Sequence, residues 1–316
     1  MRVVYSARYH VDIGLHVFPT RKYSMIHARL LEAGVIAPTD IVEPAPASWE
    51  DLARVHTAEY LAKLRDGRLS QEEQAQLELP WSREVVEGFR LMTGGTILAA
   101  KIACGHEFPT VNCKLSIHLG GGLHHAFPNH GEGFCPFNDV AVAVRVLQAA
   151  GVERVAIVDC DVHHGNGTAF IFNPGGGAPA SGEDRRVFTF SIHQQHNYPA
   201  WKPRGSLDVG LPDGAGDARF LRELERALPE VMASRPSCVF YLAGADPYED
   251  DLLGGLRLTK DGLRARDRLV VETVRAAGVP LVITLAGGYA RHVDDTVDIH
   301  VATVEEAVRG YSSVRP

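Results

Sequence analysis

A carboxylate and an imidazole stand two residues apart in the segment VDCDVHHGNG, as Asp161 and His163, directly after an apolar run of strand length. At the end of a strand, residues i and i+2 point to the same side, so both side chains could bind one divalent ion. Asp246 follows another such run and could supply a third ligand. Two carboxylates and one imidazole leave a coordination position open, which is typical of a catalytic metal site. An isolated Asp-x-His more often holds a turn-capping aspartate and a buried histidine, so the surrounding segments decide between the two.

Two adjacent histidines, His124 and His125, follow three glycines in the segment GGGLHHA. Adjacent histidines in a tight turn can provide a general base and an electrostatic partner if an acceptor orients the far nitrogen of each ring. Asp159 and Asn166 flank the metal-ligand segment and could be these acceptors. The segment has neither the Lys-Ser/Thr of a P-loop nor a GxGxxG spacing, which disfavours a phosphate-binding loop.

Tyr289 follows a Gly-Gly pair in the segment GGYA. A phenol on such a hinge could direct its O–H toward an oxyanion beside the metal. Taken alone, the same tyrosine would be an ordinary half-buried aromatic residue.

Apolar runs of strand length recur along the chain and are continuous rather than alternating, as in strands covered on both faces. They occupy residues 2–5, 115–119, 155–158, 187–192, 238–242 and 281–285. Helical patterns lie between them. Asn138 could cap a helix through Ala150, Asp217 could cap another, and Thr303 with Glu306 forms a capping box for a last helix. The alternation predicts one α/β domain over residues 1–316, around a central, mainly parallel sheet with right-handed crossovers.

The polar segments that could do chemistry follow five of these runs. They are GGGLHHA, DCDVHHGNG, HQQHNY, GADPYEDD and GGYA. Because the carboxyl ends of parallel strands form the ligand crevice, the sequence predicts that these side chains converge on one rim.

Composition narrows the classes of function. The 316 residues are 45% hydrophobic and 22% charged with a net charge of -7, which is ordinary for a globular protein and offers no basic run for nucleic acid. The apolar run 279–286 is far shorter than the ~20 residues that span a bilayer, and the first ten residues lack a signal-peptide pattern. Five cysteines without a CxxC pair suit reduced thiols, so we expect a cytoplasmic protein. The Gly/Pro-rich stretch 173–182 predicts a surface loop.

Five motifs together resemble a known family. LGGGLHHA, GFCPFND, VDCDVHHGNGT, AGADPYEDDLLGG and AGGYA, in this order, closely resemble the zinc-dependent histone deacetylase family of the arginase/deacetylase fold. The resemblance covers almost the whole chain. The TGGTILAA and HNYP segments and the short length look most like the class IV branch. The resemblance implies a parallel sheet of about eight strands.

The resemblance also implies roles for individual residues. Asp161, His163 and Asp246 match the zinc ligands, and Tyr289 matches the tyrosine that hydrogen-bonds the substrate carbonyl. His124 and His125 match the family's histidine pair, with Asp159 behind the first and Asn166 behind the second. Gly133, Phe134 and Tyr198 match the walls of an acyl-lysine tunnel. A potassium ion is expected near Asp159, Asp161, His163, Ser191 and Ile192. Several family members have Asp at the position of Asn166, so here the partner of His125 is neutral.

The implied activity is that of a zinc-dependent hydrolase that removes acetyl or longer acyl groups from Nε-acyl-lysine of a protein or peptide. The donor set would also accept Fe²⁺. Deacetylation of an acetylpolyamine or another small acylated amine stays open, and a non-catalytic acyl-lysine-binding protein is a third interpretation. Arginase-type ureohydrolases use more aspartates to bind two metals, which disfavours them. The sequence predicts neither the acyl length nor the oligomeric state.

Overall fold

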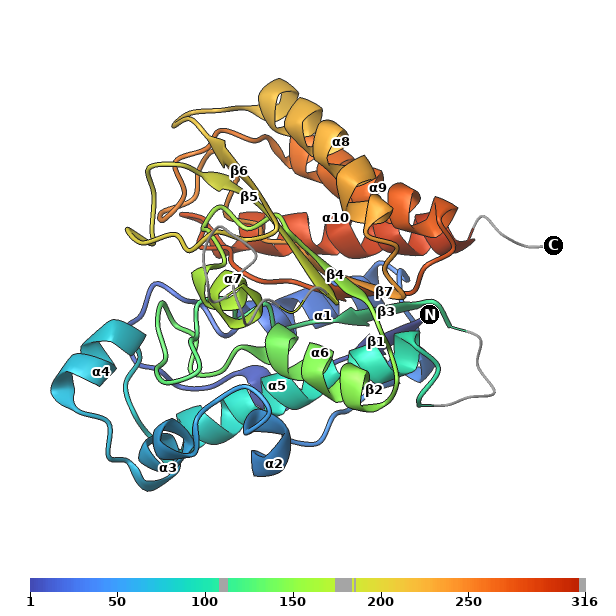
Figure 1. Ribbon diagram of the computed structural model, residues 1–316. Helices are drawn as coiled ribbons and strands as arrows, with labels where there is room; N and C mark the ends of the chain where they lie inside the picture. The colour runs from blue at the N-terminus through green and yellow to red at the C-terminus, as the bar shows by residue number, and fades with distance from the viewer. Residues whose placement is uncertain (108–112, 174–183, 185, 313–316) are drawn as a thin grey trace.

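Eight parallel strands form one sheet in the computed structural model, in the order β2-β1-β3-β8-β7-β4-β5-β6 (Figure 1). The structure describes residues 1–107, 113–173, 184 and 186–312. The strands are β1 Arg2–Val4, β2 Ile41–Val42, β3 Leu115–His118, β4 Val155–Asp159, β5 Val187–Gln194, β6 Leu207–Leu211, β7 Cys238–Leu242 and β8 Leu281–Thr284. The predicted α/β fold with a parallel sheet is confirmed.

All six predicted strands are present; β7 has the predicted ends, and the other five differ at one end by one or two residues. The two edge strands were not predicted. β2 has only two residues, and β6 alternates half-buried and exposed positions up to the buried Leu211 instead of forming a continuous apolar run. The predicted loop at 173–182 lies, beyond Asn173, outside the described residues.

Helices cover both faces of the sheet (Figure 1). The α-helices of the described residues are α1 Lys22–Glu32, α2 Trp49–Leu52, α3 Ala58–Asp66, α4 Gln71–Leu77, α5 Arg83–Ala103, α6 Asp139–Ala149, α7 Asn166–Phe172, α8 Asp217–Ala233, α9 Lys260–Ala276 and α10 Val293–Ser312. Helices α8, α9 and α10 lie on one face, where α1 packs on α10, and α5 and α6 lie on the other.

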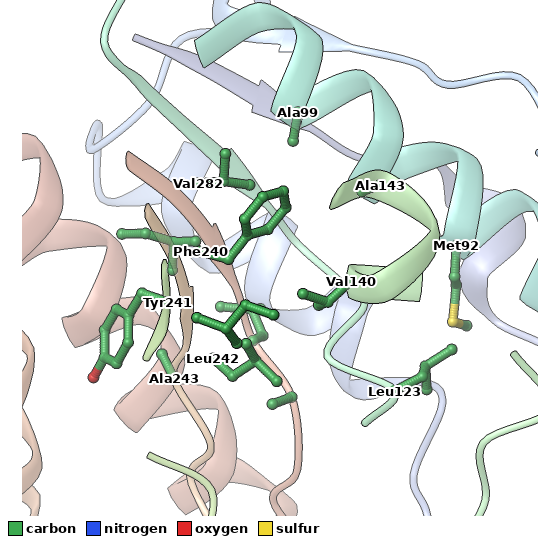
Figure 2. Close-up of a cluster of buried hydrophobic side chains, with 14 of the residues drawn as sticks. Met92, Ala99, Leu123, Val140, Ala143, Phe240, Tyr241, Leu242, Ala243 and Val282 are labelled. Carbon is green, nitrogen blue, oxygen red and sulfur yellow. The ribbon is translucent and has the colours of Figure 1, made fainter. Parts of the chain in front are cut away.

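The core between the sheet and α5–α6 is built from alternate residues of the central strands. Figure 2 shows Phe240 and Val282 directed toward Ala99 of α5 and Ala143 of α6, whereas Tyr241 points away from them. Phe240, Tyr241 and Val282 are all fully buried. Because successive strand residues face opposite sides, both faces must be apolar, which explains the continuous runs in the sequence.

Of the three predicted helix starts, one is confirmed and two are wrong. Asn138 caps α6 as predicted, since its Oδ1 accepts from the Ala141 N–H at 3.0 Å. The predicted cap at Asp217 is wrong, because Gly216 is the N-cap and Asp217 is the first helical residue. Its carboxylate instead accepts from the backbone N–H (2.9 Å) and hydroxyl (2.7 Å) of Thr259, which caps α9. A tertiary contact between two helix starts replaces the local cap.

The predicted capping box at Thr303 and Glu306 is also wrong. Helix α10 begins ten residues earlier, at Val293, because an apolar face that includes Val297 and Val304 continues through both residues. Thr303 Oγ1 donates to Asp267 Oδ2 of α9 at 2.7 Å. Glu306 accepts from Arg264, Arg268 and Arg309, each at 3.0 Å. Both residues therefore join α10 to α9.

None of the helices in the described part of the chain combines the length and the apolar character needed to cross a bilayer. All five cysteines are free thiols.

The Glu306 cluster predicts a pH-dependent contribution to stability. Burial opposes the charge of Glu306, but Arg268 and Arg264 outweigh it and lower the pKa of its carboxyl. A lowered pKa in the folded state adds stability above the unfolded pKa of about 4.3, and this stability is lost as the pH falls through the folded value. We expect Glu306→Gln to lower the free energy of unfolding by about 1.5 kcal/mol at pH 7, and by progressively less as the pH falls below about 4.3.

Urea unfolding at pH 7 and pH 3.5 measures this difference, with Glu225→Gln on the exposed side of α8 as the matched control. A loss of equal size at both pH values would show that Glu306 contributes through packing rather than through its charge.

Candidate active site

The five polar segments lie where strands β3, β4, β5, β7 and β8 end. Because every strand is parallel to its neighbours, these ends lie at one edge of the sheet, as predicted. One narrow pocket at this edge is lined by residues of three of the segments, among them His125, Asp161 and Tyr289. The loop that carries Gly133 and Phe134 forms another wall of the same pocket.

Asp161, His163 and Asp246 place one ligand atom each within 4.8 Å of one another, and all three side chains are buried. His163 Nδ1 lies 3.0 Å from Asp161 Oδ1 and 3.5 Å from Asp246 Oδ2. The second oxygen of each carboxylate is fixed by backbone. Gly287 N–H donates to Asp161 Oδ2 at 2.9 Å, and Val162 N–H donates to Asp246 Oδ1 at 2.9 Å. The other two oxygens, Asp161 Oδ1 and Asp246 Oδ2, are the ones that lie close to His163 Nδ1.

This cluster has the properties of a site for a divalent cation. Asp246 Oδ2 is buried and has no hydrogen-bond partner among the described residues. Burial and the neighbouring Asp161 raise the pKa of Asp246 to about 7, so two carboxylates here disfavour one another's charge unless a cation is shared. A Cβ at Gly287 would lie 1.9 Å from Asp246 Oδ2, so only glycine fits beside the cluster. These residues fit the implied metal.

The histidine pair is oriented as the sequence predicted. His124 Nδ1 lies 2.7 Å from Asp159 Oδ2, and His125 Nδ1 lies 2.7 Å from Asn166 Oδ1. The two Nε2 atoms are 3.0 Å apart. Burial disfavours a charged His124, but Asp159 and Asp161 outweigh it and raise its pKa to about 9. Burial and the neighbouring histidines hold the pKa of His125 well below its ordinary value. A protonated His124 can therefore donate to a neutral His125.

A buried polar network supports the loop that carries this pair. The Asp139 carboxylate accepts from the backbone N–H groups of Gly122 (3.0 Å) and Leu123 (2.7 Å) and from Thr96 Oγ1 (2.5 Å). Thr96 Oγ1 also lies 2.9 Å from Nδ1 of His118, whose Nε2 lies 2.7 Å from the Tyr9 hydroxyl. Burial lowers the pKa of His118 to about 3, so its ring is neutral and relays the hydrogen bonds.

Tyr289 lines the same pocket, with its ring centroid 6.4 Å from that of His163. Its backbone N–H donates to Asp251 Oδ2 at 2.7 Å. Ala286, at the start of this turn, has a left-handed φ of 55°. Its carbonyl accepts from the fully buried Lys22 Nζ at 3.0 Å. The turn that presents Tyr289 is thus held at both ends.

Gly133 and Phe134 line the pocket at the ligand cluster, and Tyr198 packs beside His125 and His163. The Tyr198 ring packs edge-on against His125 with centroids 5.0 Å apart, and the Phe134 ring lies 5.8 Å from that of Tyr289. Gly133 and Phe134 have φ values of 51° and 66°, both in the left-handed region. Phe18 stacks on Phe134 at 6.2 Å and completes an aromatic wall.

Two of the residues expected around a potassium ion, Asp159 and Ser191, are register partners on β4 and β5. Ser191 Oγ lies 3.0 Å from His193 Nδ1.

Four residues near the site were missed by the sequence analysis: Phe18, Lys22, Glu132 and Asp139. Glu132 directly precedes Gly133 and Phe134, and Asp139 is the last residue of the motif GFCPFND, but neither position indicates which groups the side chain contacts. Phe18 and Lys22 lie far along the chain from Phe134 and Ala286, which they contact.

The model of the histone deacetylase domain matches residues 16–304, a range that contains every ligand, histidine and tunnel residue described above. The chain belongs to the histone deacetylase family. As a member of this family of deacetylases and amidohydrolases, it is a hydrolase.

Named relatives of this histone deacetylase family protein come from plants and bacteria. Histone deacetylase 2 of Arabidopsis thaliana is 31% identical over 94% of this chain and 77% of its own. The histone deacetylase-like amidohydrolase of Pseudomonas aeruginosa is 32% identical over 82% and 68%. An uncharacterized protein of Picosynechococcus is 41% identical over 90% of both chains. The crystal structure of the HDA15 HD domain superposes with a TM-score of 0.77, at 24% identity over 98% of this chain and 88% of that one, which establishes the shared fold.

The Asp139 network predicts that the histidine loop loses support when the carboxylate is neutralised. In Asp139→Asn one oxygen becomes an NH₂ group that faces an N–H or O–H donor. Losing a hydrogen bond to a charged group costs about 1.5–3 kcal/mol, so we expect a drop of this size in the free energy of unfolding. Urea unfolding measures it, and a value equal to that of the wild type would mean that the loop does not depend on this carboxylate.

Proposed function

We propose that this protein is a metal-dependent amidohydrolase that cleaves the Nε-amide of acyl-lysine, yielding a carboxylate and the free lysine amine. The observation that carries the proposal is one pocket lined by a neutral histidine, a tyrosine and two members of a cluster of three buried metal-ligating residues. An amide needs both an activated nucleophile and a protonated leaving nitrogen, and this set of groups can supply both.

The metal would be held by Asp161, His163 and Asp246. Two carboxylates and one imidazole suit Zn²⁺, and the oxygen-rich set also accepts Fe²⁺. When bound, the ion would polarise the substrate carbonyl and make a water molecule more acidic. We also propose a structural potassium ion at the ends of β4 and β5, near Asp159, Asp161, His163, Ser191 and Ile192.

His125 is the proposed general base and acid. Its Nδ1–H donates to Asn166 Oδ1, so Nε2 is the atom available to take a proton from the attacking water. The same Nε2–H then protonates the leaving amine nitrogen as the C–N bond breaks, which returns His125 to its neutral form. His124, paired with Asp159, supplies positive charge beside the reaction.

The remaining residues bind and orient the substrate. The Tyr289 O–H donates to the oxygen of the scissile carbonyl, on which negative charge grows in the transition state. The carbonyl of Gly133 accepts from the substrate amide N–H, while Phe134 and Tyr198 enclose the lysine methylenes. Burial and the nearby Asp246 and Asp161 raise the pKa of Tyr289, which keeps the phenol protonated as a donor.

The same machinery would also deacetylate a polyamine or another small acylated amine. A panel of Nε-acyl-lysine peptides from acetyl to long-chain, assayed beside acetylated polyamines with metal-reconstituted protein, separates the two substrates. We expect the highest kcat/KM with a peptide. A clear preference for the polyamines would overturn the acyl-lysine assignment and keep the amidohydrolase chemistry. The free thiols accord with a reducing compartment, and we propose the cytoplasm.

Removing a ligand is expected to abolish metal binding and turnover together. His163→Ala and Asp246→Ala each delete one of three protein ligands, so the metal content of the purified protein should fall close to zero. His106→Ala, at an exposed position after α5, is the matched control and should keep both properties. Stoichiometric metal with full activity in either ligand variant would contradict the assignment.

Tyr289→Phe tests the oxyanion role. The variant keeps the ring and its packing, so we expect an unchanged fold and metal content but a kcat lowered by about 10²–10³-fold. Tyr311→Phe on α10 removes another buried hydroxyl, which has no hydrogen-bond partner among the described residues, and serves as the control. A kcat near that of the wild type in Tyr289→Phe would exclude this hydroxyl from the mechanism.

A further inference from the structure

We propose that Glu132 is a positioning residue, which fixes the side-chain amide of Asn166 and through it the proton on His125. The inference rests on the proposed amidohydrolase function, because it concerns the base of that reaction. Glu132 lies directly before the tunnel residues Gly133 and Phe134, and it belongs to none of the motifs that carry the family resemblance.

Both oxygens of the Glu132 carboxylate accept hydrogen bonds from neighbouring side chains. Oε1 accepts from Asn166 Nδ2 at 2.6 Å and from the Tyr198 hydroxyl at 3.0 Å. Oε2 accepts from Gln76 Nε2 at 3.0 Å and lies 3.5 Å from His130 Nε2. The side chain is only 14% exposed, so these partners replace most of its water. Donors from four different segments therefore hold one carboxylate in place.

The contact with Asn166 removes an ambiguity that an asparagine otherwise has. The two ends of a carboxamide are similar in shape, and either could face His125. An ionised carboxylate accepts hydrogen bonds but cannot donate, so Asn166 must turn its Nδ2 toward Glu132. Its Oδ1 then faces His125 Nδ1 at 2.7 Å and can only accept. His125 must therefore carry its proton on Nδ1 and present an unprotonated Nε2, which lies 3.0 Å from His124 Nε2.

Glu132 also supplies a charge that position 166 lacks. Several members of the family have Asp where this chain has Asn166, and such an aspartate would place its charge directly on the His125 ring. Here the negative charge lies one side chain farther out, and Asn166 connects it to the ring. Burial opposes the charge of Glu132, but its hydrogen bonds from His130, Asn166, Gln76 and Tyr198 outweigh burial and lower its pKa. The carboxylate is thus ionised and holds the amide firmly.

The shared oxygen links the base to the tunnel wall. Tyr198 and Asn166 donate to the same Oε1, and the Tyr198 ring packs against His125 at 5.0 Å. Glu132 thereby holds an aromatic wall and the partner of the base in one arrangement. Variants must separate these two effects, because the wall acts on substrate binding and the amide acts on proton transfer.

The first test compares Glu132→Gln with Glu78→Gln. Glu78 and Glu132 line one surface groove beside Asn166. Glu78 carries the same charge but makes no hydrogen bond to Asn166 or Tyr198, so Glu78→Gln controls for the loss of negative charge. Outer-shell substitutions of this kind typically cost about 10–100-fold in activity, and we expect this loss in kcat for Glu132→Gln only. Tyr198→Phe, which removes the other donor to Oε1, should change KM more than kcat. Equal kcat values for wild type and Glu132→Gln would overturn the proposal.

The second test moves the carboxylate. Asn166→Asp alone puts two carboxylates side by side and should be less active than the wild type. Combining it with Glu132→Gln leaves one carboxylate, now in direct contact with His125, and should recover at least tenfold in kcat over Glu132→Gln alone. A residue that only supports the loop would give losses that multiply, and that outcome would also overturn the proposal.

A spectroscopic readout keeps the inference separate from the proposed function. In protein labelled with ¹⁵N-histidine, the His125 signals are identified by their loss in His125→Gln. We expect the Nδ1–H form in the wild type and a mixture of both neutral forms in Glu132→Gln. If no substrate is turned over but this change is seen, the proposed function fails and the positioning role stands. The same tautomer in both proteins would overturn the positioning role even in an active enzyme.

Discussion

The burial of two carboxylates beside one imidazole is the constraint on which the rest of the structure depends. Asp161 and Asp246 are almost completely removed from water and lie within reach of the same point. Such a cluster costs several kcal/mol per ion unless charges and hydrogen bonds compensate it. The surrounding chain supplies both, through backbone N–H groups from Val162 and Gly287. The buried Arg266 of α9 donates to the Gly244 carbonyl at 2.5 Å and so holds the segment that leads to Asp246.

The supports of the site share one physical pattern, in which a buried ionised group orients a neutral one that faces the pocket. Asp139 orients the histidine loop through Gly122 and Leu123, and Glu132 orients Asn166. In each case a neutral group lies between the charged side chain and the reacting atoms. This placement gives the pocket-facing groups hydrogen bonds in defined directions, which is what preorganised catalysis requires.

Central strands could be predicted because burial on both faces leaves a continuous apolar run, and the site residues that follow them could be predicted because parallel strands end at one edge. The edge strand β6 could not, since Asp208 and Gly210 interrupt its pattern. The predicted start of α8 was wrong because Thr259, which is distant in sequence, binds the Asp217 carboxylate that was expected to cap the helix. The role of Glu132 was invisible because it depends on side-chain directions from four segments, which no spacing along the chain encodes.

The left-handed backbone at Phe134 limits how this enzyme can change its substrate range. A side chain at a φ of 66° pays a steric cost that is greatest for β-branched residues, so valine, isoleucine and threonine are poor replacements at this wall. Phe18 and Tyr198 are not among the residues with positive φ and tolerate a wider choice. Evolution or laboratory selection toward bulkier acyl groups should therefore proceed through those two walls first. The backbone conformation thus determines which positions of the tunnel wall can accept different side chains.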